Sequence, residues 1–478
     1  MRQVKLVLLS WLLGCIFVTA QNKQILYDFT EIPQALMINP GMSTDFQWYA
    51  GIPVLSGISF QAGSSGLTVN DLFADDGVDF NVKVRERAIY GMSTRDELSG
   101  TYQVELLNGG FRGRNRDNFY SFGIYNEGDA IGYWFKDYAI LAFEGNADQL
   151  GRKFDLGHLK TRGEMLNVFH FGINKRVDGA LTLGGRAKIY SSAFNFSSTK
   201  NKGYFVTNEG QNNLLANTID ADLELRSSGL NEIEDAIDND SSLLPGILTR
   251  RLFFGGDLGF GIDLGFTYKL NKQTVITGSL LDLGFIYSST DVKNYTIKGN
   301  ATVEGIEVIL PDAFSNSNDD FWQDLVDEVD ALVPHGTNNK SYIYFRPTKL
   351  YGSLRYNWGE PTNPSMDCDC NYMVSKRKDY TKYANGVGGQ LYVINRPKGP
   401  QAALTAFYLR RFGRALALKT TYTVDKFSWS NIGLGLNLQA GPVNIYVMAD
   451  NLLAYNNLAD SHYSSFQLGL NIISWGKK

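Results

Sequence analysis

Residues 255–270 read G-G-D-L-G-F-G-I-D-L-G-F-T-Y-K-L, and their side chains alternate with a period of two. One row is apolar or aromatic throughout, and the other is small or polar: Leu258, Phe260, Ile262, Leu264, Phe266, Tyr268 and Leu270 against Gly259, Gly261, Asp263, Gly265, Thr267 and Lys269. Successive side chains of a β-strand leave opposite faces, so this pattern predicts a strand. It is longer than an ordinary globular strand and long enough to cross a bilayer at a tilt. The alternative is a long edge strand of a soluble β-domain.

The same alternation recurs along most of the chain. It is clear near residues 102–106, 120–124, 169–190, 275–287, 432–449 and 466–472, and short turns separate many of these runs. Long excursions lie near residues 61–98, 195–250, 304–345 and 359–383, and we expect them all at the end opposite the short turns. This organisation predicts a transmembrane antiparallel β-barrel of about 14 strands, with 12 and 16 as alternatives, in the bacterial outer membrane.

Residues 1–20 have the pattern of a secretory signal. Arg2 and Lys5 precede an apolar run, and Val18-Thr19-Ala20 suits cleavage before Gln21. A lipoprotein signal ending at Cys15 is the alternative. Residues 21–45 show no strand period, which predicts a hatch or plug, and residues 46–478 form the barrel. Cleavage leaves 43 basic and 49 acidic residues, so no basic surface for nucleic acid is expected.

The mature chain keeps two cysteines, Cys368 and Cys370. A disulfide suits an exported protein, although a spacing of one residue strains the bridge. Two free thiols in a surface loop are the alternative, and two thiols alone do not make a metal site. We expect no cofactor and no metal.

The excursion at 304–345 contains a predicted helix over residues 317–334. Its apolar stripe is expected either to cap the barrel mouth or to dock a partner protein: Phe321, Trp322, Leu325, Val329 and Leu332. A second short helix is predicted over 230–240. The acidic faces of these helices match no calcium loop.

Four short motifs carry a resemblance to a known group. They are Asn39-Pro40-Gly41, residues 52–57 (I-P-V-L-S-G) with 70–72 (N-D-L), residues 184–188 (G-G-R-A-K) and residues 449–452 (A-D-N-L). In their order they resemble Bacteroidota outer-membrane barrels of unknown function related to PorV-like and PorP-like proteins, in the FadL-like superfamily. The resemblance implies a barrel and places Asn39, Pro40 and Gly41 in a hatch within the lumen.

No enzyme is predicted. The four histidines lie near no nucleophile motif, and a barrel phospholipase using His170 or His462 is only a formal alternative. We expect a non-catalytic barrel that contacts outer-membrane lipid and serves as a subunit of a secretion or assembly complex with other outer-membrane proteins. The alternative is a FadL-like conduit for small hydrophobic or amphipathic molecules. In either case the inward row is expected to include His170, Arg186, Lys188, Asp263 and Lys269.

Overall fold

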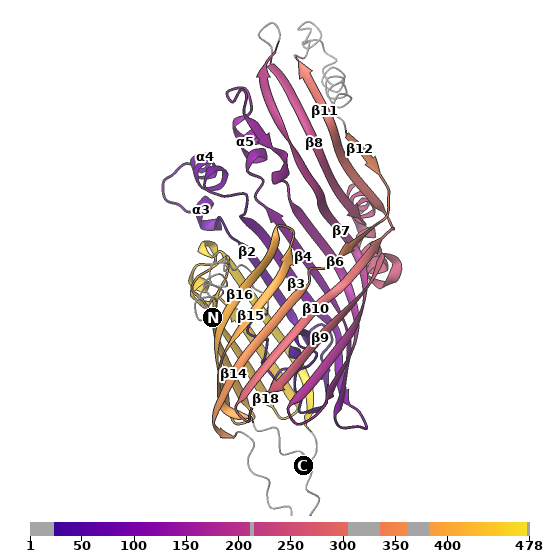
Figure 1. Cartoon of the computed structure of the whole chain (residues 1–478), viewed down its shortest axis with the longest axis vertical. Coiled ribbons are helices and arrows are strands. Elements are labelled where there is room, and N and C mark those ends of the chain that lie inside the picture. Colours follow the sequence, from indigo (N-terminus) through magenta and orange to yellow (C-terminus); the bar gives the residue numbers. More distant parts are fainter. Residues whose placement is uncertain (1–22, 211–214, 305–334, 362–381, 476–478) are drawn as a thin grey trace, which may run out of the picture.

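The computed structural model describes residues 23–210, 215–304, 335–361 and 382–475, and it forms a closed antiparallel β-barrel (Figure 1). Fourteen strand positions close the wall in the described residues, which confirms the predicted fold class and strand number. Two positions are shared by broken strands, β1 with β2 and β13 with β14. The strands of the wall are β1 (Phe46–Gly51), β2 (Ile58–Ser64), β3 (Glu97–Arg112), β4 (Asn118–Tyr133), β6 (Thr161–Arg176), β7 (Leu181–Glu209), β9 (Asp257–Lys269), β10 (Thr274–Ser288), β13 (Tyr342–Phe345), β14 (Lys349–Pro361), β15 (Tyr383–Arg396), β16 (Gly399–Phe412), β17 (Leu416–Val424), β18 (Asn431–Ala440), β19 (Val443–Asp450) and β20 (Tyr463–Trp475).

The wall closes where the last strand meets the first. β20 pairs antiparallel with β1 and, beyond the break, with β2, and both of these also pair with β3. The break spans residues 52–57, where Val54 has a φ of 66°. A single interrupted strand therefore forms one side of the seam.

The strand β9 shows why the alternation makes a barrel. Its burial alternates residue by residue: Ile262 and Leu264 are exposed on the outer face, whereas Asp263 and Thr267 are buried on the inner face. The outer face of an outer-membrane barrel is apolar because it meets lipid, and the inner face is polar. Side chains facing inward fill the lumen.

Part of the sheet continues beyond the barrel. The far half of β7 pairs with β8 (Leu215–Ser228) and β5 (Lys153–Asp155), and β8 pairs with β11 (Val292–Glu304), which pairs with β12 (His335–Asn338). Figure 1 shows this extension rising above the barrel. The range 195–250, expected to be an excursion, continues as strand over 195–209 and 215–228 and then becomes helical. In β8, Ile219, Ala221 and Leu223 alternate with acidic residues.

Short helices occupy the connections, as predicted. In chain order they are α2 (Ala35–Ile38), α3 (Val69–Phe73), α4 (Phe80–Lys83), η1 (Val84–Tyr90), α5 (Lys136–Glu144), η2 (Leu156–His158), α6 (Leu230–Asn239), η4 (Ser241–Leu243), α7 (Leu244–Arg250), η5 (Arg251–Gly255), η6 (Leu452–Asn456) and η7 (Leu458–Asp460). The helix predicted over 230–240 corresponds to α6. None of the helices in the described ranges is long and apolar enough to cross a membrane.

The two barrel ends differ. One end, here called the short-turn end, carries the turns at 113–117, 177–180, 270–273, 413–415 and 441–442, and the other is the long-loop end. The excursion near 359–383 was expected among the long loops, and this expectation is wrong. Thr274, at the start of β10, pairs with Tyr356, so β14 ends and β15 begins at the short-turn end. Cys368 and Cys370 lie outside the described residues, in the connection between those two strands.

Candidate functional site in the barrel lumen

The N-terminal segment, residues 23–45, lies inside the barrel. It has no strand, and its large apolar side chains are buried against the inner wall: Ile25, Leu26, Tyr27, Phe29, Ile32, Leu36 and Ile38. Tyr27 stacks on Tyr351 of β14 with ring centroids 4.9 Å apart, and Tyr351 in turn contacts Tyr392 of β15. We call this segment the hatch. The predicted hatch range 21–45 thus corresponds to a segment that fills the short-turn half of the lumen.

The motif Asn39-Pro40-Gly41 makes the closest approach between hatch and wall. A Cβ added at Gly184 of β7 would lie 1.9 Å from the Pro40 carbonyl oxygen. One added at Gly41 would lie 2.2 Å from the Gly265 carbonyl oxygen of β9. Only glycine leaves room for backbone to approach backbone in this way. Gly41 of the hatch therefore matches Gly184 and Gly265 of the wall.

Polar side chains of many strands hold the hatch. Asn174 of β6 donates to the carbonyl oxygens of Pro40 (2.7 Å) and Met42 (2.8 Å). Gln34 donates to Asn471 of β20 (2.8 Å), and Asn471 donates back (3.0 Å). Ser279 of β10 donates to the Ile38 carbonyl oxygen (2.6 Å). Because these bonds satisfy buried polar groups, they fix the hatch in one position.

Ion pairs hold the hatch at its short-turn side. Asp28 pairs with Arg355 of β14 (2.9 Å), and Glu31 pairs with Arg411 of β16 (2.7 Å). Burial alone would raise the pKa of Glu31, but the charges of Arg411 and Lys382 lower that pKa to about 2. A cavity of about 530 Å³ adjoins these pairs and is also lined by Lys269. The Glu31 carboxylate thus stays ionised beside a cavity at the short-turn mouth.

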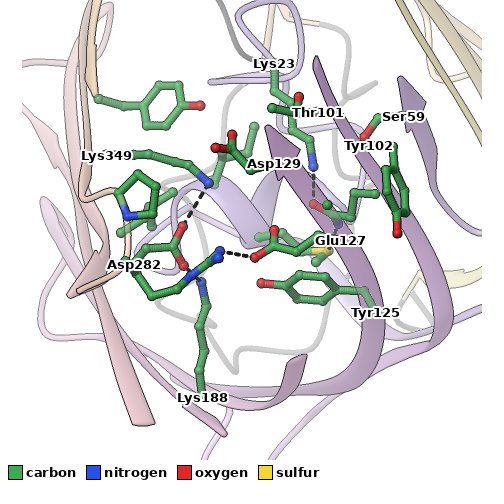
Figure 2. A pocket seen from close by; sticks show the side chains of 18 residues that line it. Lys23, Ser59, Thr101, Tyr102, Tyr125, Glu127, Asp129, Lys188, Asp282 and Lys349 are labelled. Atoms are coloured by element: carbon green, nitrogen blue, oxygen red, sulfur yellow. Dashed lines mark hydrogen bonds and ion pairs between the residues drawn. The ribbon is translucent and has the colours of Figure 1, made fainter. Parts of the chain in front are cut away.

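A second cluster of charges lies in the lumen next to the hatch. Asp263 of β9 is fully buried and accepts from Arg186 (2.6 Å) and Lys188 (2.9 Å) of β7. Lys188 also pairs with Asp282 of β10 (2.6 Å), and Asp282 pairs with Lys349 of β14 (2.9 Å). Figure 2 shows Lys188, Asp282 and Lys349 converging on one pocket. Each of these charges has an opposite partner, as buried charges require.

The pocket in Figure 2 is small, about 50 Å³. Arg346, close before β14, enters it and pairs with Glu127 of β4 and with Glu164 of β6. Lys23 of the hatch donates to Gln103 of β3. The lumen as described is therefore packed with paired side chains around a small cavity.

A β-bulge in β10 positions Asp282. The pairing with β9 passes from Leu280–Leu264 to Leu283–Ile262, so β10 carries one extra residue there. Asp282 itself has a φ of 58°, and its amide donates to the Asp263 carboxylate (2.7 Å). Such a β-bulge redirects side chains, and here it brings a carboxylate into the lumen.

The structure places the predicted inward residues as follows. Arg186, Lys188 and Asp263 meet in the charge cluster, whereas Lys269 lies apart from them at the short-turn cavity. His170 of β6 is buried beside Tyr125, with ring centroids 5.7 Å apart. Asp282, Lys349, Arg346 and Glu127 were not predicted. The residues named for partner docking, Phe321, Trp322, Leu325, Val329 and Leu332, lie outside the described residues, as do residues 1–22.

The cluster offers ion pairing and hydrogen bonding. Within the described residues, no group of three or more His, Cys, Asp or Glu side chains is arranged to hold a metal ion. The apolar side chains of the hatch fill the part of the lumen nearer the short-turn end. The paired charges of the cluster fill the part next to it.

A family model described as a family of unknown function, DUF5723, matches residues 40–450. No curated protein matches the sequence. The chain is similar to several solved structures at low sequence identity. A TodX deltaS2S3 mutant monoaromatic hydrocarbon channel is 9% identical with a TM-score of 0.41, over 93% of this chain and 94% of that one. A Pseudomonas aeruginosa FadL homologue is 8% identical with a TM-score of 0.41, over 94% and 95%. The P. putida toluene transporter TodX is 9% identical with a TM-score of 0.36, over 95% and 93%.

Proposed function

We propose a function from the lumen itself, because the chain belongs to DUF5723, a family of unknown function that names no activity. The barrel is a non-catalytic conduit of the bacterial outer membrane for small hydrophobic or amphipathic molecules. The hatch is its plug, and it moves for a molecule to pass.

The observation that carries the proposal is a group of aromatic side chains on the inner wall beneath the hatch. Several aromatic side chains point inward from the strands and are covered by the hatch: Tyr49, Phe119, Tyr351, Tyr392 and Tyr446. A water-filled pore is lined by polar groups. A site for an apolar molecule is lined mainly by hydrophobic and aromatic side chains with a few polar groups. With the hatch displaced, these aromatic side chains would line a site for an apolar molecule.

The cavity beside the hatch supports a movable plug. Asp28 and Glu31 are held by ion pairs that adjoin the short-turn cavity of about 530 Å³. That cavity provides room for the hatch to shift toward the mouth while it stays tethered to β1. The expectation of a secretion-complex subunit rested on large loops, an acidic amphipathic helix and a plugged lumen. The helix predicted over 317–334, with Phe321 and Trp322, lies outside the described residues, and the aromatic side chains beneath the hatch support the conduit instead.

A disulfide that locks the hatch tests the proposal. Ser353 of β14 donates directly to the Asp28 carboxylate (3.2 Å), so two short side chains already meet there. In a background with Cys368→Ser and Cys370→Ser, the pair Asp28→Cys and Ser353→Cys should bridge under oxidation. We expect the oxidised protein to stop uptake of the hydrophobic dye N-phenyl-1-naphthylamine into cells, and reduction to restore it.

The matched control is the single variant Asp28→Cys, which loses the same carboxylate but cannot bridge. Its uptake should not respond to oxidant. Equal uptake by the bridged and reduced forms would contradict the conduit, and the complex-subunit alternative would then be tested by the proteins that co-purify with the barrel.

A further inference from the structure

The segment between β8 and β9 stands on the outside of the barrel wall and exposes large apolar side chains. It comprises α6, η4, α7 and η5, and Figure 1 shows it as rose-coloured helices beside the wall at the right. Ile237 is 60% exposed, Leu243 56%, Phe253 48% and Phe254 52%. Exposed apolar groups gathered on one element mark an interaction surface.

A buried arginine fixes this segment to the barrel rim. Arg251 is fully buried, and its guanidinium donates to the carbonyl oxygens of Ala193 (2.5 Å) and Thr290 (3.3 Å). Its own carbonyl oxygen accepts from the Ser191 hydroxyl (2.8 Å), and that hydroxyl accepts from the Phe254 amide (2.9 Å). These hydrogen bonds fix the backbone that carries the exposed apolar residues.

The backbone turns sharply at Phe254. This residue has a φ of 69° and a ψ of 3°, a left-handed conformation that is strained for a bulky residue. Strain of this kind persists where the surroundings enforce it. Here the turn lays the Phe254 ring on Phe169 of β6, with centroids 4.5 Å apart and planes at 25°.

Phe169 belongs to a row of outward apolar residues that runs around the wall. The register of the strands places Phe169 opposite Ile189, and the row continues through Phe260, Phe285 and Phe345. Ile189, Phe260, Phe285 and Phe345 are all exposed. The segment between β8 and β9 therefore continues the outer apolar face of the barrel.

The segment also carries acidic residues. Glu234, Asp235 and Asp238 of α6 line an open groove of about 720 Å³ together with Asp291. The exposed apolar residues together with the acidic residues of this groove make the segment amphipathic. Amphipathic helices with large apolar residues lie in the plane of a membrane interface.

We infer that α6, α7 and η5 form an interfacial anchor, with Phe253 and Phe254 in contact with lipid acyl chains at the edge of the leaflet nearest the long-loop end. This inference rests on the outer-membrane placement in the proposed function. The anchor fixes the height of the rim relative to the bilayer.

Nitroxide labels on the full-length protein in phospholipid nanodiscs test the anchor. In the background with Cys368→Ser and Cys370→Ser, one label is placed at Phe253→Cys. Reference labels are placed at Ile262→Cys on the lipid-facing row of β9 and at Asn300→Cys, an exposed site on the extension. Collision rates with oxygen and with a water-soluble nickel chelate are then measured. Acyl chains favour oxygen over the chelate.

The ratio of oxygen to nickel collisions at position 253 should shift from the value at position 300 toward that at position 262. A ratio equal to that at position 300 would overturn the anchor, and so would protection from both reagents, which indicates a covering protein. If position 262 also gives the aqueous value, the membrane placement fails instead, so the two failures are distinguished.

Discussion

Adjacent glycines of β7 show how closely the hatch fits. The Cβ that alanine would add at Gly184 meets the Pro40 carbonyl carbon and oxygen at 2.1 and 1.9 Å. At Gly185, on the other face of the same strand, an added Cβ meets its nearest atoms at 3.9 Å. The two positions therefore separate hatch packing from the general effect of losing a glycine.

We expect Gly184→Ala to destabilise the protein by about 1–3 kcal/mol, the usual cost of overpacking. Gly185→Ala should be close to neutral, because its methyl group makes only ordinary van der Waals contacts, at 3.9 Å, on the outer face. Urea unfolding of the two variants in lipid vesicles measures the difference. Equal midpoints would mean that the hatch does not press on β7 in the membrane.

At the same scale, the sequence predicted the charge cluster only in part. Arg186, Lys188 and Asp263 stand in rows of strict alternation, so their inward direction could be expected. Asp282 could not, because the bulge reverses the parity of β10 at that residue. The spacing of three between the outward Leu280 and Leu283 is the signal that marks the reversal.

Among the elements, β9 is the one whose faces the sequence predicted most completely. Its outward residues Leu258 to Leu270 are all exposed, as the alternation indicated. Ile262 lies near the middle of this strand. We expect Ile262→Arg to cost about 2–4 kcal/mol, as for a charge near the bilayer midplane.

The matched control is Asn300→Arg on β11, an exposed strand position outside the barrel wall. It should leave assembly unchanged because water already solvates that site. The yield of heat-modifiable protein in the outer membrane measures both variants. Equal yields would contradict a lipid-facing β9.

The placement of whole connections was harder to predict than the strands. Every strand reverses the chain, so the end at which an excursion emerges depends on how many strands precede it. The interrupted strand β1–β2 and the extension strands β8, β11 and β12 disturb this count. The excursion between β14 and β15 was therefore assigned to the wrong end, although its bounds were nearly correct.

For the whole molecule, the filled lumen predicts that the barrel does not conduct ions steadily. In planar bilayers the intact protein should show no large steady current, because the hatch blocks the described lumen beyond the short-turn cavity and the pocket within the charge cluster holds only about 50 Å³. Removal of residues 21–45 from the mature protein should give a stepwise conductance. A steady open pore in the intact protein would contradict a plugged barrel.

The seam between β20 and the pair β1–β2 also determines the order in which the hatch and the wall can fold. The hatch emerges early during synthesis and export, yet its Gln34 is hydrogen bonded to Asn471, 437 residues later. Contacts so distant in sequence form late, since the entropy of closing the intervening chain must first be overcome. A nascent barrel must therefore keep an apolar hatch from aggregating until its last strand arrives, and pairing of β20 completes both the wall and its plug in one step.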